Sequence, residues 1–347
     1  MRVLVTGHDG YIGSVMVKLL HAEGHEVIGL DSYLCGEGGL GEDDKTPAIR
    51  KDVRDVIAKD LEGVEGVVHL AALCNDPVGD LNSDWTFDIN QVASRRLAEL
   101  SKAAGVRRFL YASSCSMYGQ AGKELVEEEA PLRPLTPYAT SKVRAEEDIR
   151  RLADSHFSPV FMRNATAYGL SPRLRADVLL NNFVCWAHTT GKIRVMSDGT
   201  AWRPLIHVED IARAFAVALT APREAIHNEA FNVGSNEQNY RVRDLAEIVH
   251  TILPDCAVEY AADGGSDSRS YRVSFDKLGR QLPAFRPTWD ARSGARQVYD
   301  AVRAAGVTLE DFSSRKFTRL AQFKYLLEEG LVDNSLRWKN KVSVIDG

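Results

Sequence analysis

A tyrosine and a lysine four residues apart, Tyr138 and Lys142, have the spacing and chemistry needed for proton transfer. Residues four apart lie on the same face of a helix, so the lysine ammonium can stabilise a nearby phenolate. A free tyrosine has a pKa of about 10, and a partly desolvated cation beside it lowers that value toward neutrality. We therefore expect Tyr138 to act as general base toward a hydroxyl group and as general acid toward a ketone.

A serine-rich segment, residues 113–119, lies upstream of this pair and directly follows the apolar run 108–112, which predicts a strand. The spacing of Tyr138 and Lys142 alone is also common in surface pairs on ordinary helices. The serine cluster at a strand end favours chemistry instead, because Ser114 can hold the same substrate oxygen by a hydrogen bond. We expect Ser114, Tyr138 and Lys142 to be the catalytic residues.

The first 31 residues predict the elements of a dinucleotide site. Residues 1–5 are an apolar run typical of a buried strand, and residues 14–22 have the periodicity of a helix. Residues 26–30 predict a second strand, which ends at Asp31. A strand, a glycine turn, a helix, a strand and then an acid are the opening units of a dinucleotide-binding α/β fold.

Three glycines, Gly7, Gly10 and Gly13, form the turn between the first strand and the helix. Gly7 permits the tight turn, and Gly10 lets the backbone approach a pyrophosphate at the helix N-terminus, where free N–H groups favour an anion. Gly13 allows the helix and the strand to pack closely. Asp31 is placed where a carboxylate can bind the ribose hydroxyls of NAD and would repel the 2′-phosphate of NADP.

These motifs resemble the extended branch of the short-chain dehydrogenase/reductase superfamily, whose members act on nucleotide sugars. The resemblance covers most of the chain and is carried by TGHDGYIGS, DV, HLAA, SSCSMYG, YATSK, RPLIHVEDIA and FNVGS. It implies NAD as the cofactor and a nucleotide-diphosphate sugar as the substrate. It also implies a homodimer formed through the helices expected at residues 85–103 and 138–153.

The resemblance further implies which residues contact the cofactor. Asp52 and Val53 would border the adenine, and Asn90 would face the active site from a helix. The remaining cofactor contacts come from the glycine turn and from the end of the strand expected at residues 66–72; they are Tyr11, Ile12, Leu70, Ala71 and Ala72.

The resemblance also implies substrate contacts, and for some of these residues a structural role is an alternative. Arg203 and Arg269 match arginines that meet the diphosphate, although either could be an ordinary surface ion-pair residue. Asn181 lies near an asparagine that binds the nucleotide, and Ser116 and Thr166 fall at sugar-contacting positions. Thr166 replaces the customary asparagine, which leaves the identity of the sugar open. Asn75, with the neighbouring aspartate, either touches the sugar or forms a local Asp-Pro turn.

The absence of carboxylates from residues 114–116 limits the reactions that this site can catalyse. Sugar-nucleotide 4,6-dehydratases of the resembled family carry Thr-Asp-Glu where this chain has Ser114-Cys115-Ser116, and the decarboxylases place a glutamate at the position of Ser116. Without these carboxylates, the chemistry that remains needs only a hydride and one proton. The sequence thus predicts epimerisation at C4, with 4-ketoreduction as an alternative. A catalytically silent dinucleotide sensor is a second alternative, although the catalytic trio is present.

Composition excludes several other classes of function. The net charge of −5 gives no basic field for nucleic acid, and no apolar run is long enough to span a membrane. No signal peptide is expected, because the first residues enter a strand directly. Five scattered cysteines without a Cys-x-x-Cys motif predict a reduced, cytoplasmic protein with no bound metal. His69 lies inside an apolar run, where a packed core histidine is the better interpretation than a catalytic one.

Taken together, the pattern predicts an α/β protein with a Rossmann-type, doubly wound parallel sheet and a smaller mixed substrate region. We expect residues 1–165 to bind NAD, with residues 201–233 returning to that domain, and residues 166–347 to bind the nucleotide sugar. Residues 124–133 predict a loop. Beyond residue 166, helices are expected at residues 181–190, 208–219, 242–253 and 316–329.

Overall fold

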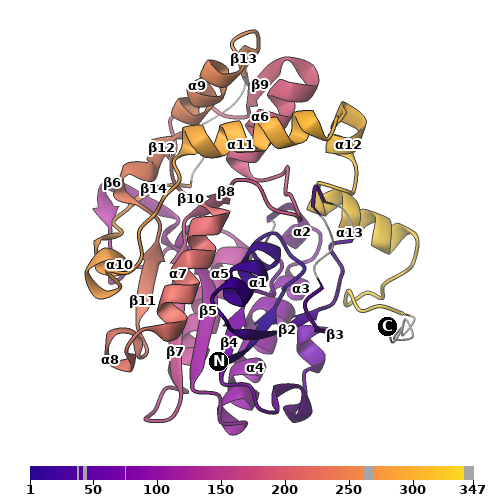
Figure 1. Cartoon of the computed structure of the whole chain (residues 1–347). Helices are drawn as coiled ribbons and strands as arrows, with labels where there is room; N and C mark the ends of the chain where they lie inside the picture. The colour runs from indigo at the N-terminus through magenta and orange to yellow at the C-terminus, as the bar shows by residue number, and fades with distance from the viewer. Residues whose placement is uncertain (37–38, 42–44, 75, 262–268, 340–347) are drawn as a thin grey trace.

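The computed structural model describes residues 1–36, 39–41, 45–74, 76–261 and 269–339, and a parallel sheet lies at its centre (Figure 1). The strand order is β11-β7-β5-β4-β1-β2-β3, so the winding direction reverses between β1 and β4. Ligands of such sheets bind at this reversal, outside the carboxyl ends of the strands. The strands are β1 (Arg2–Thr6), β2 (Glu26–Asp31), β3 (Ala48–Arg50), β4 (Gly66–His69), β5 (Arg108–Ser114), β7 (Ser158–Asn164) and β11 (Ala230–Val233).

Helices cover both faces of the sheet. On one face, α1 (Gly13–Ala22) and α7 (Val208–Thr220) pack in the same core cluster as Val3 and Val5 of β1. On the other face, α4 (Ala93–Ala103) and α5 (Pro137–Arg150) share a cluster with Leu4. Successive strand side chains point to opposite faces, so β1 is apolar at every central position, as the sequence predicts.

A second region, at the top of Figure 1, contains a third core cluster, and the described residues form three small sheets outside the main one. The sheets pair β8 (Thr166–Tyr168), β10 (Trp202–His207) and β12 (Asn239–Arg241); β9 (Lys192–Val195) with β13 (Ala257–Tyr260); and β6 (Gln120–Val126) with β14 (Ser270–Val273). The cluster is built mainly from α6 (Leu179–Thr190), α9 (Val242–Ile252) and α11 (Ala291–Ala304).

The remaining helices are short. They are α2 (Asp76–Gly79), α3 (Ser83–Phe87), α8 (Arg223–Ile226), α10 (Asp276–Gln281), α12 (Leu309–Ser313), α13 (Arg319–Glu328), the 3₁₀ turns η1 (Val53–Asp55), η2 (Ala58–Leu61), η4 (Cys115–Tyr118) and η5 (Asn236–Gln238), and the π turn η3 (Asp88–Val92).

Two elements differ from the sequence expectation because distant segments pair with them. The expected loop at residues 124–133 begins as strand β6, since β14 supplies a parallel partner almost 150 residues further along the chain. Within residues 201–233, β11 pairs with β7 of the main sheet and α7 and α8 pack against that sheet, whereas β10 pairs with β8 and β12 instead. A partner strand cannot be identified from the local pattern of apolar residues.

Two helical expectations also change. The single helix expected at residues 85–103 is divided into α3, the π turn η3 and α4. The part of the chain after α9, where one helix was expected at residues 316–329, contains α10, α11 and α12 as well as α13. In α11, Asp290 caps the N-terminus by accepting a hydrogen bond from the Ser293 N–H group, a start signal that the sequence analysis missed.

His69 has the structural role expected of it. At the end of β4, its Nδ1 lies 2.6 Å from Thr6 Oγ1 and its Nε2 lies 2.7 Å from Ser94 Oγ, so both ring nitrogens have partners. Burial, with a smaller contribution from the Lys142 charge, lowers the pKa of His69 to about 3.

This lowered pKa makes folding stability depend on pH. An unfolded histidine has a pKa of about 6.5, so between that pH and about 3 the unfolded chain binds a proton that the folded protein does not. We expect His69 to remove stability as the pH falls through this window, by up to about 1.4 kcal/mol per pH unit. Urea unfolding between pH 7 and 4.5 should show a shallower acid slope for His69→Gln than for wild type, whereas His156→Gln, at an exposed site, should keep more of the slope. Equal slopes for wild type and His69→Gln would contradict the assignment.

Candidate active site

A cavity of about 1040 Å³ opens along the carboxyl ends of the central strands. It brings together residues from both ends of the described chain. Most of the residues expected from the sequence line it, namely Gly7, Gly10, Tyr11, Ile12, Gly13, Asp31, Asp52, Val53, Leu70, Ala71, Ala72, Ser114, Ser116, Tyr138, Lys142, Thr166, Arg203 and Arg269.

The glycine turn leaves no room for side chains. Gly7 has a φ of +73°, and a Cβ atom there would lie 2.8 Å from the backbone nitrogen of Ala71. A Cβ atom on Gly13, the first residue of α1, would lie 2.0 Å from the Gly7 carbonyl oxygen. The turn therefore presents bare backbone at a helix N-terminus, which is the environment that a pyrophosphate needs. On this ground the site fits a dinucleotide.

Two carboxylates border the same end of the cavity, and the protein fixes both. Asp31 accepts hydrogen bonds from the backbone N–H groups of Asp9, at 3.1 Å, and Tyr33, at 2.8 Å. Asp52 accepts two hydrogen bonds from the Arg54 side chain, at 2.9 and 2.7 Å. Both residues line the cavity, and their contacts to the adenosine ribose and the adenine stay predictions.

Asn90 has a different role from the one expected. It is fully buried and does not line the cavity. Its Oδ1 accepts from the Leu73 N–H group at 2.8 Å, and its Nδ2 donates to the Leu73 carbonyl at 2.9 Å and to Ser141 Oγ at 3.2 Å. Both ends of the amide are thus used within the protein. Asn90 positions the chain that follows Ala72 rather than facing a ligand.

Helix α5 places Tyr138 and Lys142 beside the end of β5. The helix starts where Thr136 caps it by accepting from the Ala139 N–H group at 3.2 Å. Lys142 Nζ donates to the Ala112 carbonyl of β5 at 2.7 Å and lies 5.7 Å from the centre of the Tyr138 ring. The expected juxtaposition of the two side chains is therefore present.

The charges at this centre are strongly affected by burial. Burial lowers the pKa of Lys142 to about 8, against smaller raising effects from Cys74 and Glu146. Burial also raises the pKa of Tyr138, while a hydrogen bond with Ser114 acts in the opposite direction. Ser114 itself donates to Ser116 Oγ at 2.9 Å. The pKa of Tyr138 is thus raised, and not lowered toward neutrality as the sequence predicts, because burial disfavours the charged phenolate.

The far end of the cavity carries the two expected arginines. Arg203 of β10 donates to the main-chain oxygen of Arg269, and Arg269 donates to Asp76 Oδ2 at 2.9 Å. These contacts bring both guanidinium groups into one wall, from segments that are 66 residues apart. Asp76 belongs to α2 and also lines the cavity; Asn75, its predicted companion, lies outside the described residues.

Asn181 does not line the cavity; the next residue, Asn182, does. The Asn181 side chain is fully buried, accepts from the Gly169 N–H group at 2.9 Å, and donates to the Tyr11 hydroxyl at 3.2 Å and the Arg175 carbonyl at 3.0 Å. A shift of one position on α6 turns a side chain by about 100° around the helix axis, which decides between the core and the cavity.

The structure adds cavity residues that the sequence analysis missed. Buried Arg175 pairs with Asp177 at 2.8 Å and donates to Cys74 Sγ at 3.2 Å, close to the catalytic centre. Asn164, at the end of β7, is buried, and its Oδ1 has no hydrogen-bond partner in the described part of the chain. A buried amide oxygen of this kind marks a place where a ligand can donate a hydrogen bond. In the sequence, Asn164 could have been found as a polar residue at the end of an apolar run that predicts a buried strand.

Two features are absent from the described residues. They contain no group of three or more histidine, cysteine or acidic side chains arranged to hold a metal ion. Among the helices formed by these residues, none has the length and apolar character that crossing a bilayer requires.

Two relatives of the chain are named UDP-glucose 4-epimerases. It is 34% identical over 258 residues to the UDP-glucose 4-epimerase of Mycolicibacterium smegmatis, covering 68% of this chain and 77% of that protein. It is 29% identical over 305 residues to the UDP-glucose 4-epimerase of Corynebacterium glutamicum, covering 80% and 90%.

Solved structures with the same fold include enzymes of more than one reaction type. MoeE5 in complex with UDP-glucose and NAD matches with a TM-score of 0.76 and 27% identity, over 88% of this chain and all of that one. The NAD-dependent NDP-hexosamine 5,6-dehydratase TunA matches with a TM-score of 0.79 and 25% identity, over 87% and 98%. The model of the "NAD dependent epimerase/dehydratase family" matches residues 3–234. The chain therefore belongs to this family of NAD-dependent, extended short-chain dehydrogenase/reductase enzymes.

Proposed function

We propose that this enzyme interconverts the C4 epimers of a nucleotide-diphosphate sugar. The observation that carries the proposal is the catalytic centre: Ser114, Tyr138 and Lys142 line one wall of the cavity, and the following residues Cys115 and Ser116 provide no carboxylate. The names of the curated relatives agree with this reaction. UDP sugars are the first substrates to test, because the solved relative MoeE5 binds UDP-glucose.

In this mechanism the side chains of the protein transfer the proton of the C4 hydroxyl group and hold its oxygen atom. Bound NAD would supply the hydride acceptor for C4 of the sugar and, once reduced, the hydride donor to the other face of the same carbon. Tyr138 takes the proton of the C4 hydroxyl as the carbonyl forms, and gives it back when the carbonyl is reduced. Ser114 holds that oxygen by a hydrogen bond, and Lys142 supplies positive charge beside the phenol.

The charge of Lys142 explains how a buried phenol becomes a base. Burial raises the pKa of Tyr138, which favours the neutral form. The phenolate is stabilised when a cation lies nearby in a medium of low dielectric constant. Lys142 is one such cation, and the positively charged nicotinamide of bound NAD is a second. Ionisation of Tyr138 is thereby linked to occupancy of the cofactor site.

Dehydration is the second candidate, and one observation favours it. Asp76 lines the cavity and raises the pKa of Tyr138 through its charge, so a carboxylate is present near the catalytic centre although residues 115 and 116 provide none. Asp76 is paired with Arg269, however, which matches an arginine that binds the diphosphate in the resembled family. We therefore rank elimination of water below epimerisation.

Product analysis tests the proposal. Incubated with UDP-glucose, UDP-galactose and their N-acetyl and uronic acid counterparts, the purified enzyme should convert at least one sugar to its C4 epimer, with no net change in absorbance at the nicotinamide band. Tyr138→Phe should lower kcat by about 10²-fold or more and leave substrate affinity nearly unchanged, because only the proton acceptor is lost. NMR spectroscopy of the products distinguishes epimerisation from the alternative reactions. A keto-deoxy product would establish dehydration instead, and steady consumption of NADH would establish ketoreduction.

The pH profile tests the role of Lys142. Without its charge the pKa of Tyr138 rises, so Lys142→Met should move the acid limb of kcat toward higher pH by about one unit and lower the plateau. In wild type, where burial lowers the pKa of Lys142 to about 8, the lysine charge is present below that pH and lost above it. Steady-state rates from pH 6 to 9.5 provide the comparison, with exposed Lys59→Met as the matched control. If the acid limb lies at the same pH for Lys142→Met as for Lys59→Met, the charge of Lys142 does not affect the pKa of Tyr138.

A further inference from the structure

The segment 319–338, which we call the strap, lies beside the cofactor end of the cavity. It consists of α13 and a turn closed by an antiparallel bridge between Val332 and Trp338. The family model ends at residue 234, so the strap lies outside the matched region. Two of its side chains, Arg319 and Phe323, nevertheless line the cavity.

Three strap side chains hold the loop that follows Asp31. Arg319 donates to the Cys35 carbonyl at 2.9 Å, Gln322 donates to the Leu34 carbonyl at 3.1 Å, and Trp338 donates to the Ser32 carbonyl at 2.7 Å. The chain around Asp31 is expected to bind the adenosine ribose. The strap thus fixes the backbone at the point where that half of the cofactor would enter.

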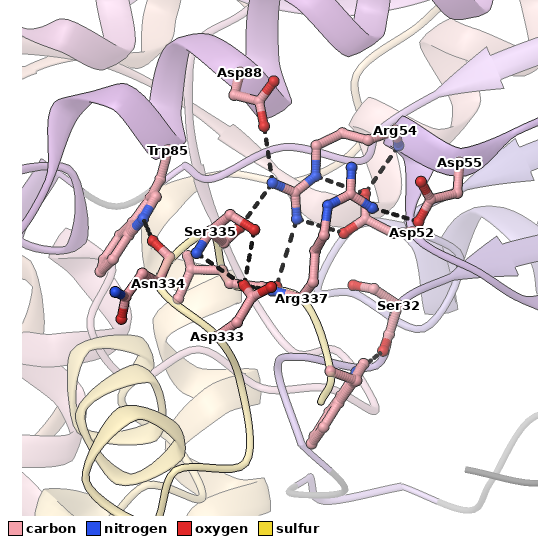
Figure 2. A network of polar contacts seen from close by, with 12 residues as sticks. Ser32, Asp52, Arg54, Asp55, Trp85, Asp88, Asp333, Asn334, Ser335 and Arg337 are labelled. Atoms are coloured by element: carbon pink, nitrogen blue, oxygen red, sulfur yellow. Dashed lines mark hydrogen bonds and ion pairs between the residues drawn. The ribbon is translucent and has the colours of Figure 1, made fainter. Parts of the chain in front are cut away.

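A buried cation, Arg54, ties the strap to the adenine side (Figure 2). Its guanidinium donates to both carboxylate oxygens of Asp52 and to the Ser335 carbonyl, the latter at 2.7 Å. Burial lowers the pKa of Arg54, but the hydrogen bonds to Asp52 and Asp88 outweigh it and raise the pKa overall. Asp52 is therefore held by the same side chain that holds the strap.

Apolar packing joins the same parts of the molecule. Phe323, Leu326 and Leu336 of the strap share a core cluster with Leu34 and Val53. The strap is also attached at a further point, where Trp85 donates to the Asn334 carbonyl at 2.7 Å (Figure 2). The walls next to the expected ribose and adenine contacts are thus packed against the strap, and they cannot open widely while it is in place.

We propose that the strap is a working part of the cofactor site: Arg319 and Phe323 contact the adenosine half of NAD, and the strap must detach before NAD leaves. The inference concerns retention of the cofactor and does not depend on which nucleotide sugar reacts. Retention would suit any reaction that returns a hydride to its substrate, because the reduced cofactor must remain bound between the two transfers.

Release of NAD, measured without any substrate, tests the proposal. The protein loaded with NADH is mixed with excess NAD⁺, and the loss of bound NADH fluorescence gives the dissociation rate. Arg319→Ala and Phe323→Ala should each release NADH about tenfold faster than wild type, since each removes a contact from the wall of the site. Lys324→Ala, an exposed cation on the same helix, should release it at the wild-type rate. Equal rates in all four folded proteins would overturn the proposal.

A second measurement separates retention from simple loss of folding. Trp338→Phe removes the hydrogen bond to Ser32 and keeps a smaller aromatic ring at this position, so it should speed NADH release several-fold with little change in Tm. In wild type, saturating NAD⁺ should slow hydrogen exchange at the amides of residues 319–328 and leave those of α9 unchanged. Exchange in α13 that does not respond to NAD⁺ would overturn the proposal. Because no substrate is present, failure of the epimerase assignment would leave both measurements interpretable.

Discussion

The close approach of two backbone segments at the glycine turn is the constraint on which the rest of the site depends. A side chain on Gly13 would meet the Gly7 carbonyl oxygen at 2.0 Å, and one on Gly7 would meet the Ala71 nitrogen at 2.8 Å. This closeness places the N-terminus of α1 directly above the ends of β1 and β4, where the strand order reverses. The crevice at that reversal is then available to a dinucleotide.

The site also requires that α5, which carries Tyr138 and Lys142, keeps a fixed position against the sheet. Buried Lys142 meets it by donating to the Ala112 carbonyl at 2.7 Å. One turn further along α5, Glu146 pairs with Arg163 of β7 at 2.7 Å, with both side chains buried. Buried ion pairs of this kind fix geometry more reliably than they add stability. Tyr138 is thereby held beside Ser114, and the low dielectric environment that fixes it also makes its proton hard to remove.

The outer walls of the cavity come from parts of the chain with no local relation to the glycine turn. Arg203 and Arg269 meet because β10 and β14 lie side by side, and the strap returns from the C-terminal region to the loop after Asp31. A family enzyme can in this way keep its cofactor core and alter how tightly its ligands are held.

The parallel sheet, the glycine turn, the proximity of Tyr138 and Lys142 and the family could all be predicted from the sequence. These features rest on local signals: alternation between apolar strands and helices, glycines at fixed spacing, and a tyrosine and lysine one turn apart. The burial of His69 was also predictable, because its neighbours in the strand are apolar on both sides.

The direction of the polar side chains, toward the cavity or into the core, follows from the packing of distant segments. Asn90 and Asn181 turn into the core, whereas Asn164, Arg175 and Arg319 reach the cavity, and the partner of β6 comes from a distant strand. The physical reason is that a side chain's direction depends on a rotation of about 100° per helical residue and on pairings between segments far apart in the chain. Neither the direction of a helical side chain nor the pairing of distant segments can be predicted from a short stretch of sequence.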